Sequence, residues 1–134
     1  MASANLLGFS MLEFRNGGAI TANSMVKHDT TANYVVACTA RTDLGIGVCV
    51  DTGSATANAE QVRVQTHGIA KVRYGNTVTV GQELMVKDGG TGELTPVTAD
   101  STYVTVAKAL EAGASGEICA VLLVTPVGAG PANS

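Results

Sequence analysis

Short runs of Val, Thr, Leu and Ile alternate with clusters of Gly, Asn and Asp along most of this chain. β-Branched residues favour strands and the clusters favour turns, so the pattern predicts a string of short β-strands. The clearest alternation places Val62 and Val64 on one side of a sheet and Arg63 and Gln65 on the other. Strands are predicted at residues 24–28, 33–39, 44–51, 60–67, 69–74, 83–87, 92–98, 102–110 and 117–125.

This regular spacing of strands and Gly turns predicts an all-β fold, a small β-barrel or sandwich of β-tulip-like form with an extended N-terminal arm. A doubly wound fold needs several long helices, which the pattern does not offer. Residues 100–113 (DSTYVTVAKALEAG) mix helix formers with β-branched residues, and we predict a strand there.

Three zones follow from the pattern. Residues 1–22 form an apolar arm that contains LLGFSMLEF, residues 23–126 form the β-barrel domain, and residues 127–134 form a flexible C-terminal tail. An arm this apolar does not stay in water. It packs either on its own barrel or on a neighbouring subunit or another protein.

Composition narrows the class of protein. The chain has 134 residues, enough for one domain, and 46% of them are hydrophobic although only 4% are aromatic. Charged residues make up 14% and the net charge is −3, which argues against direct binding of nucleic acid. The N-terminus lacks a basic n-region, and no apolar run approaches about 20 residues, so we expect a soluble, intracellular chain without a membrane span.

The three cysteines, Cys38, Cys49 and Cys119, are far apart and form no Cys-x-x-Cys pair. We therefore expect three buried thiols in a reducing compartment, and no metal or cofactor.

The stretch VCVDTGSATA, residues 48–57, is the strongest candidate for catalysis. Asp-Thr-Gly-Ser after an apolar run resembles the dimeric retroviral-type aspartic proteases, in which two carboxylates share a proton across a water. Asp51 would be the catalytic residue in that alternative. The second apolar run lacks the helix that should follow it, so we favour a strand end and a polar turn, with Asp51 and Ser54 bound to local backbone groups.

The other candidates have simpler interpretations. DGGTGEL, residues 88–94, lies between two predicted strands, so we expect a hairpin turn rather than a phosphate-binding loop. His28 and His67 lack the surroundings of a catalytic triad. Arg63, Lys71 and Arg73 share one strand parity and form either a solvated face or a contact with an acidic partner.

From residue 44 onward, three segments define an order of turns and strands. LGIGVCVDTGSATANAEQVRVQTHGIAKV is followed by GNTVTVGQELMVKDGGTGELTPV and then by VAKALEAGASGEICAVLL. This order resembles the small β-barrel decoration (cement) proteins of tailed bacteriophages, over residues 44–124. The positions that carry the resemblance are Gly68, Gly81, Gly92, Gly116 and the triplet Ala109-Leu110-Glu111.

The resemblance implies a structural virion protein rather than an enzyme. Such proteins are made in the host cytoplasm and bind the outside of the capsid as homotrimers, where they bridge major capsid proteins and stabilise the shell. The residues expected to contact the capsid or a neighbouring subunit lie in the apolar arm: Leu6, Leu7, Phe9, Met11, Leu12 and Phe14.

A carbohydrate-binding or receptor-binding β module is a further alternative. Sugar sites usually stack the ligand on aromatic side chains, and only Tyr34, Tyr74 and Tyr103 are available outside the arm.

Overall fold

The computed structural model describes residues 10–53, 61–98 and 102–129, and all of the regular structure in these ranges is β. The all-β fold class predicted from the sequence is therefore confirmed. The strands are β1 (Ser10–Asn16), β2 (Ser24–His28), β3 (Tyr34–Ala37), β4 (Gly47–Cys49), β5 (Gln61–Arg73), β6 (Glu83–Val86), β7 (Leu94–Pro96), β8 (Tyr103–Ala109) and β9 (Ile118–Ala129).

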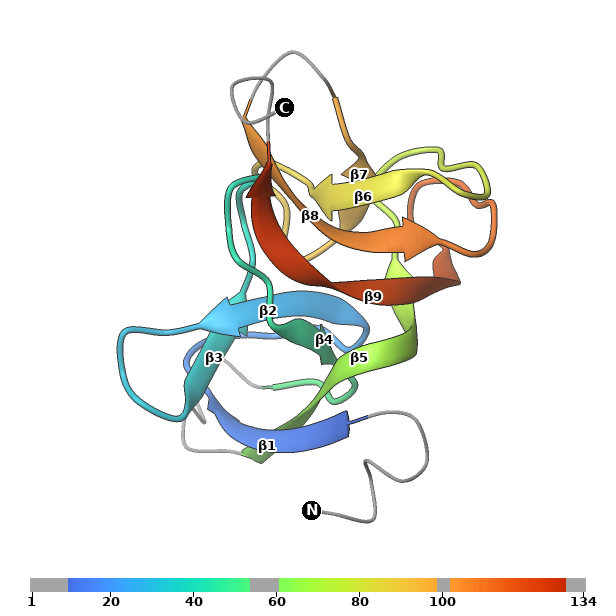
Figure 1. Ribbon diagram of the computed structural model, residues 1–134. Coiled ribbons are helices and arrows are strands. Elements are labelled where there is room, and N and C mark those ends of the chain that lie inside the picture. The colour runs from blue at the N-terminus through green and yellow to red at the C-terminus, as the bar shows by residue number, and fades with distance from the viewer. Residues whose placement is uncertain (1–9, 54–60, 99–101, 130–134) are drawn as a thin grey trace.

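The first five strands close into a barrel, in the lower half of Figure 1. β1 pairs with β3 in parallel, and antiparallel pairs join β3 to β2, β2 to β4 and β4 to β5. β5 then pairs with β1, so the ring has no free edge strand. The closing pair sets Phe14 opposite Val62 and Leu12 opposite Val64.

β5 is long enough to serve both halves of the molecule. Beyond Gly68 it leaves the barrel and begins a second sheet, in the order β5-β9-β8-β6-β7. A parallel bridge between Tyr74 and Leu94 brings the last strand back beside the end of β5. The two predicted strands at 60–67 and 69–74 are thus one continuous strand with a bend at Gly68, where φ is 89°.

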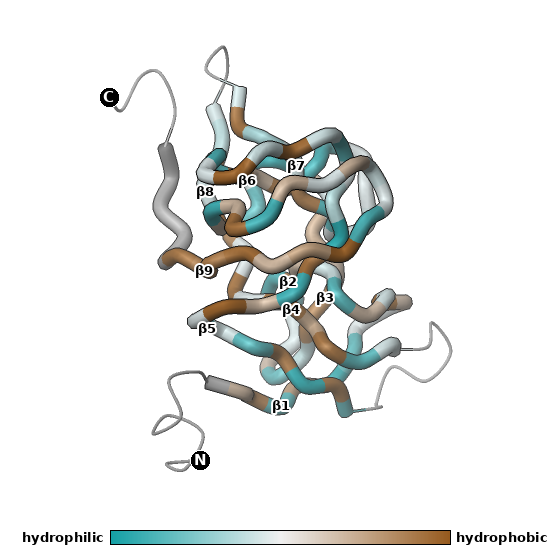
Figure 2. Tube along the Cα trace, turned by 90° about the vertical axis from the view of Figure 1, so that its right-hand side faces the viewer, coloured by the Kyte–Doolittle hydropathy of each residue, from teal (hydrophilic) through white to brown (hydrophobic). Residues whose placement is uncertain are grey.

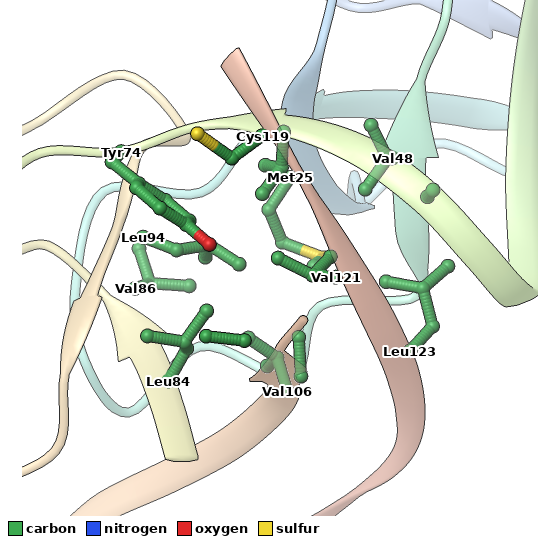
Figure 3. Packing of buried hydrophobic residues seen from close by; sticks show 14 of the residues in the cluster. Met25, Val48, Tyr74, Leu84, Val86, Leu94, Val106, Cys119, Val121 and Leu123 are labelled. Carbon is green, nitrogen blue, oxygen red and sulfur yellow. The ribbon is translucent and has the colours of Figure 1, made fainter. Parts of the chain in front are cut away.

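Two clusters of buried side chains fill the two halves. The first lies inside the barrel and consists of Ile20, Val26, Val35, Cys49, Val62 and Val64. The second lies under β5, β6, β8 and β9, and it also takes Met25 and Val48 from the first half (Figure 3). Tyr74 is the largest fully buried side chain, and its hydroxyl donates to the backbone carbonyl of Glu111 at 2.7 Å.

Loops connect the two halves by hydrogen bonds. The amide of Met25 on β2 donates to the carbonyl of Gly92 at 2.9 Å, inside the hairpin that joins β6 to β7. A Cβ atom on Gly92 would lie 2.8 Å from the carbonyl oxygen of Met25, and its φ of +97° also disfavours a side chain. The DGGTGEL segment is therefore the predicted hairpin turn, and its glycine allows β2 to approach closely.

Two predicted zone boundaries differ from the structure. The second half of the predicted arm, Ser10–Asn16, is β1 of the barrel, because Phe14 supplies apolar surface that the small barrel core needs. The predicted flexible tail began at residue 127, but β9 continues to Ala129 since residues 127–129 pair with β8. Residues 1–9 and 130–134 lie outside the described residues.

Candidate interaction surface

Three of the six predicted contact residues lie on β1. Phe14 packs against the first buried cluster, with its ring edge-to-face on His28 at a centroid distance of 5.7 Å. Phe14 is only partly buried there, so the expectation that it also contacts another subunit or the capsid stays a prediction. Leu12 is 42% exposed and Met11 is half-buried, while Leu6, Leu7 and Phe9 lie outside the described residues.

The Asp-Thr-Gly-Ser stretch ends β4 as a polar turn. Asp51 accepts hydrogen bonds from the backbone amide of Arg63 at 2.8 Å and from its guanidinium at 3.1 and 3.0 Å. These hydrogen bonds lower the pKa of the Asp51 carboxyl, and those from the guanidinium have the largest effect. Gly53 forms an isolated antiparallel bridge with Ile20, and Ser54 lies outside the described residues. The Asp51 carboxylate is therefore bound to the backbone amide and the guanidinium of Arg63 on β5, and not to the groups of its own turn that the sequence predicted.

The cysteines are free and buried, as expected. Burial raises the pKa of Cys38 to about 12 and also raises the pKa values of Cys49 and Cys119. Thiolates are the reactive form of cysteine, so these environments favour inert side chains. Within the described ranges, no group of three or more His, Cys, Asp or Glu is placed to hold a metal ion.

His28 packs on Phe14, whereas the backbone carbonyl of His67 accepts a hydrogen bond from Gln65 Nε2 at 3.1 Å. The same amide nitrogen donates to the carbonyl of Ile69 at 2.7 Å, so it spans the bend in β5. No helix in the described part of the chain is long and apolar enough to cross a membrane.

The outer side of the second sheet carries an apolar surface, which we call the β5–β9–β8 face and define by Ile69, Leu110, Ile118 and Leu122. These side chains are 64%, 39%, 44% and 39% exposed, respectively. Ile69 lies opposite Leu122 in the pairing of β5 with β9, and Lys108 on β8 lies on the other side of Leu122. Figure 2 shows the hydrophobic stretches of β5 and β9 running side by side.

Alternation explains why this face exists. The residues that alternate with it on β5 and β9 point into the second core: Ala70, Val72, Cys119, Val121 and Leu123. Both sides of β9 are thus apolar, although only one side is covered. An apolar patch on one side of a sheet is typical of a contact with another protein.

Charged side chains surround the face. Lys71 Nζ lies 3.5 Å from Glu111 Oε1, and that oxygen also accepts the amide of Ala120 at 2.7 Å. The hydrogen bond from the backbone amide of Ala120 is the main reason that the pKa of the Glu111 carboxyl is lowered. Arg73 and Lys108 have no carboxylate within 4.0 Å among the described residues. Of the predicted basic stripe, Arg63 and Lys71 are therefore paired with carboxylates, whereas no carboxylate in the described part of the chain pairs with Arg73.

Sequence reasoning missed this face. The run ICAVLLV, residues 118–124, has no polar positions, so the pattern gave no sign of which side was covered. The available signal was β5, in which Lys71 and Arg73 have the same parity as Ile69 and mark that side as exposed.

Neither a protein-family model nor a curated protein sequence matches this chain. Among solved structures, the fold is similar to the N base of the head fiber protein gp8.5 in bacteriophage phi29. The TM-score is 0.69 and the similarity covers 88% of this chain and 96% of that chain. Sequence identity is 14%, so this likeness shows a shared fold and nothing finer.

Proposed function

We propose that this chain is a structural protein of a phage virion that assembles as a homotrimer on the outside of the head. The observation that carries the proposal is the likeness of its fold to a head fiber base over nearly the whole of that chain. The order of turns and strands over residues 44–124 resembles that of decoration proteins, and this is a separate line of support because it depends on the sequence and not on the fold.

The partner in this proposal is the major capsid protein, and the action is mechanical. A trimer at a junction of the shell contacts several capsid proteins at once, so weak contacts add up to stable attachment. Bridged capsid proteins separate less readily, which stabilises the shell against pressure from the packaged DNA. We propose no catalysis and no cofactor.

The bonding of Asp51 supports a structural role over the protease alternative. A catalytic Asp pair needs a carboxyl that shares a proton at working pH, whereas the three bonds from Arg63 hold Asp51 in its ionised form. Tyr74 is fully buried and cannot stack on a sugar, which leaves the partly buried Tyr34 and Tyr103 as the tyrosines for that alternative.

Co-sedimentation with purified heads of the phage that encodes the chain tests the proposal. We expect saturable binding to heads that lack the protein, and an increase in the temperature at which those heads release DNA. If the folded protein stays in the supernatant and none of it sediments with the heads, that result would contradict a role on the head. An unrelated β-barrel protein of similar size is the control for protein that enters the pellet without binding the heads.

A further inference from the structure

We propose that the β5–β9–β8 face is the surface through which three copies of this chain meet, with its apolar side chains around the three-fold axis. This inference rests on the proposed function for the number of copies and adds the surface and the contacts. It assigns the face to a second copy of the chain rather than to the capsid.

The apolar part of the face fits the centre of such an interface. Ile69 and Leu122 are direct neighbours across β5 and β9, and Ile118 lies on the same side of β9 further along. Near a three-fold axis, each side chain contacts the same side chain of the other two copies. An apolar residue there is therefore covered by apolar residues. Between Ile118 and Leu122 lies Ala120, whose small side chain lets another surface approach.

The charges favour a second copy as the occupant. In a three-fold ring, one flank of each copy contacts the opposite flank of the next copy. The β5 flank carries Lys71 and Arg73, and the β6 flank carries Glu83, which lies beyond β8 in the same sheet. The two flanks therefore offer opposite charges to one another.

Arg73 and Glu83 have opposite charges, and neither belongs to an ion pair among the described residues. Arg73 has no carboxylate within 4.0 Å in the described residues, and the described contact of the Glu83 carboxylate is the Thr105 hydroxyl at 3.5 Å. Lys71 is already held by Glu111. Lys108 lies in register opposite Glu83 without forming an ion pair, so it is the nearest competing cation. We assign Arg73 of one copy to Glu83 of the next.

A charge-reversal cycle tests the pairing. Arg73→Glu alone and Glu83→Arg alone each place like charges across the interface, and we expect each to weaken the trimer about tenfold. The double variant restores the attraction with the signs exchanged, so its trimer should dissociate at nearly the wild-type concentration. Sedimentation equilibrium over a dilution series measures the constant. A double variant no tighter than the single variants would overturn the assignment.

Apolar variants test the face itself. Leu122→Lys and Ile69→Lys each place a charge at the centre of the contact, and we expect a loss of at least about thirtyfold in trimer affinity. Leu44→Lys is the matched control, because Leu44 is 58% exposed on the loop between β3 and β4 and lies outside the face. Circular dichroism melting confirms that each dissociated variant is folded.

Binding to heads, measured on the same variants, separates this inference from the proposed function. Dissociation of the Leu122 and Ile69 variants in solution supports the inference whether or not the wild type binds heads. Variants that stay trimeric but no longer bind heads overturn it and leave the proposed function standing, with the face assigned to the capsid. A wild-type chain that is a monomer or a dimer in solution also overturns it.

Discussion

At the residue scale, the burial of Tyr74 raises the pKa of its hydroxyl, and this shift makes the stability of the fold depend on pH. Burial, followed by the nearby Cys119 and Glu111, raises the pKa of Tyr74 from 10.0 to about 12. The unfolded chain loses this proton near pH 10 while the folded chain keeps it. The folded state then binds more protons, so its stability falls as the pH rises between these values.

Tyr74→Phe tests this account in two ways. At neutral pH the substitution leaves the carbonyl of Glu111 without its buried donor, and we expect a loss of about 1–2 kcal/mol in urea unfolding. The tyrosinate absorbance of the wild type minus that of the variant should titrate near pH 12 or at alkaline unfolding. A difference curve centred near pH 10 would contradict the burial of Tyr74. Cys38, raised to about 12 from 9.0, adds to the alkaline loss of stability in both proteins.

Asp51→Asn is the second test at this scale. Arg63 lowers the pKa of Asp51, so the contribution of this pair is present above the ordinary pKa of 3.8 and is lost as the pH falls through the lower folded value. The variant should unfold at slightly lower urea concentration at pH 7 and lose less stability than the wild type on acidification. Identical acid profiles for the two proteins would contradict the pairing, and activity on peptides that disappears in Asp51→Asn would instead support the protease alternative.

At the element scale, the strands were largely predictable and their grouping was not. Alternation and turn residues placed most of the strands from β2 to β9 within a few residues of the structure, because Val and Thr runs bounded by Gly and Asn have few other conformations available. Gly68 divided one strand into two predictions, since a glycine inside a strand also reads as a turn. β1 was assigned to an arm because LLGFSMLEF is one apolar segment at the terminus, and that segment hid the alternation of Leu12, Glu13, Phe14 and Arg15.

Gly68→Ala tests the bend in β5. Its φ of 89° is costly for any residue with a Cβ atom, so we expect a loss of about 1–2 kcal/mol in unfolding free energy. Gly18→Ala is the control, because a Cβ atom there meets nothing within 4 Å and its φ is not positive. Equal effects of the two substitutions in urea unfolding would argue against a strained bend.

Phe14→Ala tests whether β1 belongs to the barrel. Its ring packs on the first buried cluster, so we expect a loss of about 2–3 kcal/mol in the unfolding free energy. Leu12 is more exposed on the same strand, so Leu12→Ala should lower the unfolding free energy by less than about 1 kcal/mol. The thermal melt of each variant measures this difference. A Phe14→Ala protein as stable as the wild type would place that strand outside the core.

At the scale of the whole molecule, closure depends on pairs between distant segments. The barrel closes through Ser10 opposite His67, and the second sheet closes through Tyr74 and Leu94. Local patterns of hydrophobicity do not determine which strands pair, so it could not be predicted from them that both halves of the molecule share β5. For the same reason, the exposed face on β5, β9 and β8 became visible only in the structure.

The central claim is that this chain is built into a virion, and quantitative mass spectrometry of purified virions tests it most directly. Virions banded on a density gradient from the phage that encodes the chain are compared with the soluble fraction of the same lysate. We predict many copies per virion, in a number divisible by three, with little chain left in the soluble fraction. Abundant chain in the lysate and none in the banded virions would contradict the claim.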